Sequence, residues 1–114
     1  MTLDEWKVKY EQKAEPLIPL PGFSLYFEPD KGFFYWHKFG DVFEIDHTCT
    51  DDVMWAHNKC MDMAVATCCK ILRTATYRNW VAYKRLTKAT VNWSLSGFRP
   101  NGKFYYIFEK QVKG

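Results

Sequence analysis

Three side chains close together in the chain could transfer a proton. His47 follows Glu44 and Asp46 within the segment 42–48, which reads as a β-strand. Histidine exchanges protons near neutral pH, and a carboxylate beside it can act with it in acid–base catalysis. However, side chains alternate along a strand, so this segment predicts Glu44 and Asp46 on one face and His47 on the other. We therefore expect a structural or surface role for these residues, with a catalytic role as the alternative.

The cysteines and one histidine raise the possibility of metal binding or nucleophilic catalysis. His57 and Cys60 are three residues apart, so a helix would place them on one face about one turn apart. A tetrahedral zinc site typically needs two properly spaced pairs of ligands, and that pattern is missing. Cys60 and Cys68 fall on an apolar stripe, where a cysteine behaves as a small hydrophobic residue. We expect no metal, reduced thiols and no Cys–His nucleophile. The candidate residues for such a site are Cys49, His57, Cys60, Cys68 and Cys69.

Charge is distributed unevenly along the 114 residues. The chain carries a net charge of +3, but residues 1–62 sum to −6 and residues 63–114 sum to +9. Between Asp62 and Glu109 there are eight lysines and arginines and no acidic residue. A half of the chain in which positive charge strongly predominates indicates an anionic partner. This partner could be a phosphate, a nucleic acid or an acidic protein surface. The alternative is that the acidic half folds against the basic half and neutralises it.

The segment 73–88 is the candidate binding surface. Lys84 and Lys88 are four residues apart and share a helix face, and Arg78 and Asn79 precede a predicted helix whose N-terminus favours anions. Its aromatic residues could stack on bases or anchor a protein interface, or they could pack the core. The candidate residues are Arg73, Arg78, Asn79, Trp80, Tyr83, Lys84, Arg85 and Lys88.

The first half of the chain predicts one helix, three strands and a second helix. Thr2 and Glu5 form a capping-box pattern that begins a helix over residues 3–15, with Trp6 and Tyr10 on its apolar face. Strands are predicted over 23–28, 33–39 and 42–48, and their short turns predict an antiparallel meander. Apolar residues at helical spacing predict the second helix over 51–69.

The second half predicts a strand, a short helix and a closing hairpin. The segment 70–77 is rich in β-branched residues, and Asn79 is a candidate N-cap for a helix over 80–88. Two strands, 90–98 and 103–110, flank a turn at 100–102. Strand, helix and strand in the middle of the chain indicate a parallel crossover. We expect one α/β domain spanning residues 1–114, with a mixed sheet and helices on its faces.

This order of elements resembles the GNAT acyltransferase family, and the likeness covers nearly the whole chain. The most specific stretch is 74–89, where Asn79 and Ala82 match the start of the family's short helix. The closing segment 104–110 is similar to that of small phage-encoded GNAT-like proteins, some of which are internal virion components. The resemblance implies a mixed, largely antiparallel central sheet flanked by helices.

Two departures from the family pattern concern its chemistry. The family's glycine-rich loop, whose N–H groups hold the pyrophosphate of acetyl-CoA, corresponds to residues 47–52, which contain no glycine. Asp51 and Asp52 stand where the phosphates would lie, and the negative charge of these two carboxylates would repel the phosphates. The family's general-acid tyrosine falls on Leu86, which cannot donate a proton, although Tyr83 lies nearly one turn earlier.

We therefore expect a catalytically degenerate GNAT-like protein without a cofactor, of phage origin, that binds a macromolecular partner with an acidic surface. The partner is expected to be a protein, with nucleic acid as the alternative, and the role that of a virion component, a host-takeover factor or an inhibitor of a host defence system. The competing hypothesis is an active acetyl-CoA-dependent N-acetyltransferase in which Arg78, Asn79 and Arg85 hold the cofactor. No long apolar run or signal-peptide core is present, so we expect no membrane association and a location in the cytoplasm, or in the host cytoplasm or virion for a phage protein.

Overall fold

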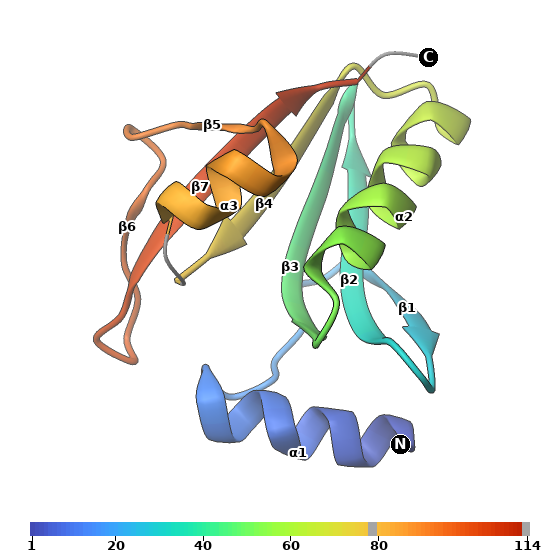
Figure 1. Ribbon diagram of the computed structural model, residues 1–114, viewed down its shortest axis with the longest axis vertical. Coiled ribbons are helices and arrows are strands. Elements are labelled where there is room, and N and C mark those ends of the chain that lie inside the picture. The colour runs from blue at the N-terminus through green and yellow to red at the C-terminus, as the bar shows by residue number, and fades with distance from the viewer. Residues whose placement is uncertain (78–79, 113–114) are drawn as a thin grey trace.

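A helix opens the chain, as its capping box predicts. The structure is a computed structural model, and it describes residues 1–77 and 80–112. Helix α1 spans Leu3–Lys13, with the Thr2 hydroxyl accepting from the Glu5 N–H and the Glu5 carboxylate accepting from the Thr2 N–H. Trp6 and Tyr10 are its buried residues, so α1 lies with one face against β2 and β3 (Figure 1).

Three strands then form the predicted antiparallel meander. They are β1 (Ser24–Glu28), β2 (Gly32–Phe39) and β3 (Val42–Thr50). Gly32 begins β2 with a φ of +126°, and a Cβ atom there would lie 2.0 Å from the carbonyl oxygen of Cys49 on β3. The close approach of two backbones therefore requires glycine at this position.

The middle of the chain forms the predicted crossover. Helix α2 spans Val53–Ala66 and leads into β4 (Ile71–Thr76), which pairs with β3 in parallel from Val42↔Ile71 to Ile45↔Thr74. Beyond Ile45 and Thr74 the two strands no longer pair, and they separate. Helix α3 (Trp80–Thr87) follows and lies over β4 and β7 in Figure 1.

The C-terminal part differs from the prediction in one strand. The segment expected as a continuous strand over 90–98 forms only β5 (Thr90–Val91) and β6 (Gly97–Phe98), with turns between them. The reason is local, because the Asn92 side chain accepts the N–H of Leu95 and the Ser96 hydroxyl accepts the N–H of Ile107. The turn before β7 (Phe104–Gln111) forms as predicted, with Gly102 at a φ of +80°.

The sheet is mixed and largely antiparallel, with helices on both faces. Its order is β1-β2-β3-β4-β7-β5, with β6 also paired to β7, and β3–β4 is the parallel pair. One core lies on the α2 side of the sheet and the other on the α1 side. The first contains Phe34, Phe43, Ile45, Cys60, Ala64, Cys69 and Leu72, and the second contains Trp6, Tyr10, Phe33, Tyr35 and Cys49. Within the described residues, no helix has the length and apolar character needed to cross a bilayer.

Candidate functional site

A cavity of about 110 Å³ lies where β3 and β4 separate. Tyr35 of β2 pairs with Asp46 of β3, but Phe33 of β2 pairs with Cys49 of β3, so two residues of β3 oppose one residue of β2, which is a β-bulge. His47 occupies this bulge with a φ of +48°. The bulge bends β3 away from β4, and the cavity opens between them. Its polar lining comes from both sides of the sheet and includes Asp46, His47, His57, Tyr77, Tyr83 and Tyr105.

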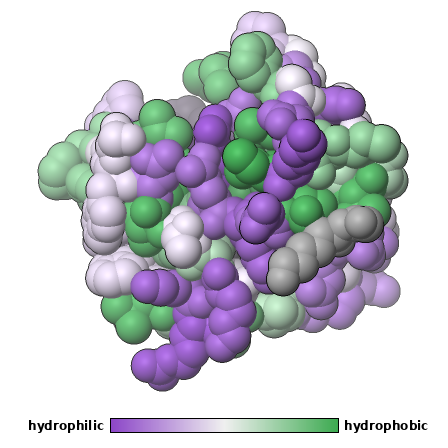
Figure 2. Space-filling model, turned by 90° about the horizontal axis from the view of Figure 1, so that it is seen from above, coloured by the Kyte–Doolittle hydropathy of each residue, from purple (hydrophilic) through white to green (hydrophobic). Residues whose placement is uncertain are grey.

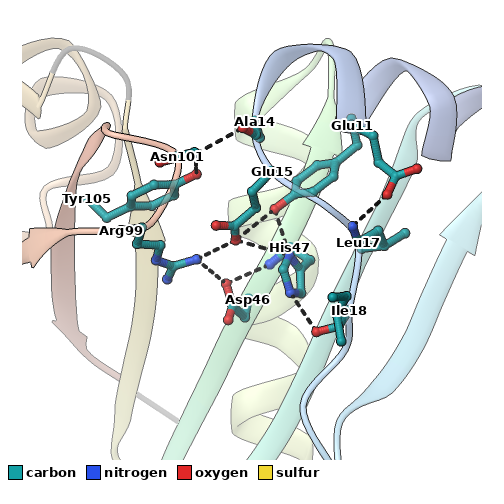
Figure 3. Close-up of polar contacts among 11 residues, drawn as sticks. Glu11, Ala14, Glu15, Leu17, Ile18, Asp46, His47, Arg99, Asn101 and Tyr105 are labelled. Carbon is teal, nitrogen blue, oxygen red and sulfur yellow. Dashed lines mark hydrogen bonds and ion pairs between the residues drawn. The ribbon is translucent and has the colours of Figure 1, made fainter.

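On the α1 side, the cavity ends in a buried polar cluster (Figure 3). The Nε2 atom of His47 lies 3.2 Å from the Ile18 carbonyl oxygen, so Nε2 carries a proton and donates it. The Nδ1 atom lies 2.6 Å from the Tyr10 hydroxyl oxygen and 3.4 Å from Glu15 Oε1. Burial raises the pKa of Tyr10, with the Glu15 carboxylate adding to the effect, so the phenol keeps its proton. These contacts hold the imidazole between α1 and the segment that follows it.

The cation of this cluster is Arg99. Its Nη1 atom lies 2.7 Å from Glu15 Oε1 and 3.2 Å from Asp46 Oδ1. Burial by itself lowers the pKa of Arg99, but the two carboxylates outweigh it and raise the pKa. Ligand atoms of Glu15, Asp46 and His47 lie within 4.8 Å of one another, which is a spacing that could hold a metal ion. The guanidinium already bridges the two carboxylates, so it supplies the positive charge that a metal would bring.

The expectation that His47 and Asp46 lie on opposite faces is wrong. The bulge adds a residue to β3 and breaks the alternation, and Asp46 Oδ1 accepts the backbone N–H of His47 itself at 2.9 Å. Glu15, Arg99 and Tyr105 were not singled out from the sequence as neighbours of His47. They come from distant segments, and the unusual backbone of His47 was the missing information.

On the α2 side, the cavity is lined by groups that are held neutral. His57 Nε2 accepts from the Lys110 ammonium at 3.3 Å, and the same ammonium donates to the Thr87 carbonyl at 2.7 Å. Burial, with Lys110 adding to it, lowers the pKa of His57 to about 4. Burial also raises the pKa of Tyr83, whose phenol hydrogen bonds with Thr74. Near neutral pH, His57 is therefore uncharged and Tyr83 is protonated.

The N-terminus of α2 is closed by aspartates. Asp52 is the N-cap and accepts the Trp55 N–H at 3.0 Å, and this bond and the Lys31 contact lower the pKa of Asp52. Lys31 lies 3.2 Å from Asp52, and Lys9 lies 2.7 Å from Asp51. The positive end of the helix dipole is thus already matched by a carboxylate of the chain.

The structure divides the candidate basic residues into two groups. Lys84, Arg85 and Lys88 are exposed and have no ion-pair partner among residues 1–77 and 80–112. Arg73 instead pairs with Glu109 at 2.7 Å and with Glu44 at 3.8 Å. The acidic half of the chain therefore neutralises part of the basic half, in keeping with the alternative described above. It does not neutralise Lys84, Arg85 and Lys88, as far as the described residues show.

The remaining candidate residues lie in different environments. Tyr83 points into the cavity and packs on Phe108, with ring centroids 4.5 Å apart, whereas Leu86 is 53% exposed and does not line the cavity. Trp80 is half-buried at the start of α3, against Trp93 and Tyr106. The candidates Arg78 and Asn79 lie outside the described residues.

The architecture described here is GNAT-like. It combines a meander, a β3–α2–β4 crossover whose parallel strands separate, and a last strand inserted between β4 and β5. A crystal structure from Lactobacillus plantarum, described as a "putative N-acetyltransferase", has a similar fold, with a TM-score of 0.61 and 14% sequence identity over 80% of this chain and 68% of that chain. No protein-family model matches the sequence, and no curated protein matches it.

Proposed function

We propose that this protein is a catalytically degenerate GNAT-like protein that binds a macromolecular partner with an acidic surface through α3. The observation that carries the proposal is the exposure of Lys84, Arg85 and Lys88 without ion pairs among the described residues. Lys84 and Arg85 on the last turn of α3, with Lys88 directly after the helix, attract an anionic surface over several ångströms and orient it. The partner is expected to be a protein. A phage origin, and a role as a virion component, host-takeover factor or inhibitor of a host defence system, remain predictions from the sequence resemblance.

The N-terminus of α2 supports a function without acetyl-CoA. A pyrophosphate at a helix N-terminus is held by backbone N–H groups, and here the Asp52 carboxylate accepts the Trp55 N–H. Asp51 and Asp52 would also oppose an anion at that position. Their partners Lys9 and Lys31 already contact them, so these lysines do not form an open phosphate site.

Reversing the charges of α3 tests the proposal. We expect the triple variant Lys84→Glu, Arg85→Glu and Lys88→Glu to bind fluorescent poly-glutamate at least tenfold more weakly than the original protein at low salt, because three attractive charges become repulsive. Fluorescence anisotropy measures the dissociation constant, and the thermal midpoint should change little, since exposed charges contribute about 0–1 kcal/mol each.

A matched control separates the surface from net charge. The variant Lys7→Glu, Lys13→Glu and Lys70→Glu has the same net charge but changes residues outside α3. We expect it to keep most of the affinity. Equal losses in the two variants would mean that poly-glutamate senses only net charge, and the assignment to α3 would then fail.

The second candidate function is an active N-acetyltransferase, and the cavity between β3 and β4 is the observation in its favour. Tyr83, which keeps its proton, and His47 line this cavity, and a phenol and an imidazole are groups that exchange protons in acid–base catalysis. Isothermal titration calorimetry with acetyl-CoA distinguishes the candidates. Our proposal expects no dissociation constant in the low micromolar range, and such an affinity would favour the enzyme.

A further inference from the structure

Five aromatic rings form a continuous strip beside α3. Trp80 and Trp93 have centroids 5.5 Å apart, and Trp93 and Tyr106 have centroids 5.9 Å apart. The strip continues from Tyr106 to Phe104 at 5.0 Å and from Phe104 to Phe98 at 5.1 Å. These rings come from the start of α3, the turn after β5, β7 and β6. None of the five belongs to the two core clusters.

Much of the aromatic strip faces solvent. Trp93 is 56% exposed and Phe98 is 78% exposed, and Leu95 beside Trp93 in the chain is also exposed. Isolated exposed apolar residues are ordinary, but contiguous ones mark interaction sites. Hydrophilic and hydrophobic regions also alternate across the end of the molecule seen in Figure 2. The strip is thus a water-facing apolar surface that burial against another molecule would stabilise.

The aromatic strip is continuous with the basic side of α3. Trp80 and Lys84 are four residues apart on that helix, so they are neighbours on its surface. Arg85 and Lys88 extend the positive charge beyond Lys84. The segment 80–108, which supplies the whole strip and these cations, contains no aspartate or glutamate. Apolar and positive surfaces therefore lie side by side, and no acidic residue of this segment interrupts them.

We propose that the aromatic strip and α3 form one docking surface for a polypeptide segment that carries acidic residues next to an apolar anchor side chain. The inference rests on the proposed function and names the chemistry of its partner. Charge complementarity to Lys84, Arg85 and Lys88 selects the acidic residues. The exposed rings of Trp93 and Phe98 provide the aromatic surface on which an apolar anchor would be buried, as in many interface hot spots.

The geometry of the rings favours a polypeptide over a single-stranded nucleic acid. Trp80–Trp93, Trp93–Tyr106 and Phe98–Phe104 meet at interplanar angles of 79°, 82° and 87°. In such edge-to-face pairs, the edge of one ring covers part of the face of its neighbour. Bases stack on open ring faces, whereas side chains such as leucine or phenylalanine pack against ring edges and faces alike.

A random peptide display library of 16-residue peptides, selected on the full-length protein, tests the inference. We expect the enriched peptides to contain both acidic residues and at least one large apolar residue. The double variant Trp93→Ala and Phe98→Ala should bind a selected peptide at least tenfold more weakly by fluorescence anisotropy. The charge-reversed α3 variant should lose a similar factor. Phe39→Ala, at a ring that is 69% exposed on β2 and outside the strip, should bind as the original protein does.

The outcomes separate this inference from the proposed function. Acidic peptides without apolar residues, or unchanged binding by the Trp93→Ala and Phe98→Ala variant, would overturn the inference and leave the basic surface of α3 in place. Selected peptides whose binding ignores the charge reversal would overturn both. Tighter, ring-dependent binding of a thirty-nucleotide oligo(dT) that displaces the peptides would assign the surface to nucleic acid. Circular dichroism of the double variant checks that it is folded, as the exposure of both rings predicts.

Discussion

Replacing Gly32 by alanine is expected to lower the free energy of unfolding by about 4 kcal/mol or more, enough to unfold much of a small domain. The added Cβ would lie 2.0 Å from the Cys49 carbonyl oxygen, which is backbone of the central strand β3 and cannot rotate away. A φ of +126° is also strained for any residue with a side chain. Chemical denaturation followed by circular dichroism measures the loss.

Gly40→Ala is the matched control for Gly32→Ala. Gly40 also has a positive φ, at +59°, but nothing lies within 4 Å of the Cβ position. Its replacement should cost only about 1 kcal/mol, since it meets backbone strain without a clash. Similar losses for the two variants would show that the close approach of Gly32 to β3 is not what makes that glycine necessary.

The second large effect is a loss of stability in acid that originates at His57. Its pKa is about 4 in the folded protein, against 6.5 for an unperturbed histidine. Between these values the unfolded chain binds a proton that the folded protein does not, so stability falls as the pH falls from about 6.5 to 4. A difference of this size corresponds to about 3 kcal/mol. Above pH 6.5 His57 contributes no pH dependence.

His57→Gln isolates this contribution from the other titrating groups. Glutamine keeps an acceptor for the Lys110 ammonium but does not titrate. Denaturation curves at pH 7, 5.5 and 4 give the free energy of unfolding of both proteins. These two free energies should converge or cross as the pH falls, because only the original protein loses the His57 contribution in acid. A stability difference that stays constant over this range would contradict the neutral, buried state of His57.

Elements determined by local interactions could be predicted from the sequence. The capping box of Thr2 and Glu5 begins α1, and Asp52 caps α2 within the segment predicted as a helix. The meander and the parallel crossover follow from turn chemistry and chain order, and the GNAT-like sheet was inferred from that order. For the helices and turns, the signal lies within a few residues of the feature that it specifies, and the sheet follows from the order of these elements.

Features that depend on contacts between distant segments could not be predicted. The cluster around His47 needs a β-bulge with a positive φ at a non-glycine residue, and no pattern of residues in the sequence predicts such a bulge. Arg99 was recognised as one basic residue among eight, but its partners Glu15 and Asp46 lie 84 and 53 positions away. Among residues 1–77 and 80–112, the structure also separates Lys84, Arg85 and Lys88, which have no ion pair, from Arg73, which pairs with Glu109.

The contacts of Glu15 and Ala14 with Arg99 and Asn101 have a consequence for folding on the ribosome. Arg99 binds Glu15, and the Asn101 side chain donates to the Ala14 carbonyl 87 positions earlier, so the end of α1 is held by the hairpin before β7. During synthesis these partners are made 84 and 87 residues after Glu15 and Ala14. Because closing a loop of this length costs chain entropy, we expect these contacts to form late in folding. The apolar face of α1 can therefore pack on β2 and β3 as soon as those strands are made, whereas the Glu15 carboxylate gains its Arg99 partner only after residue 99 has been made.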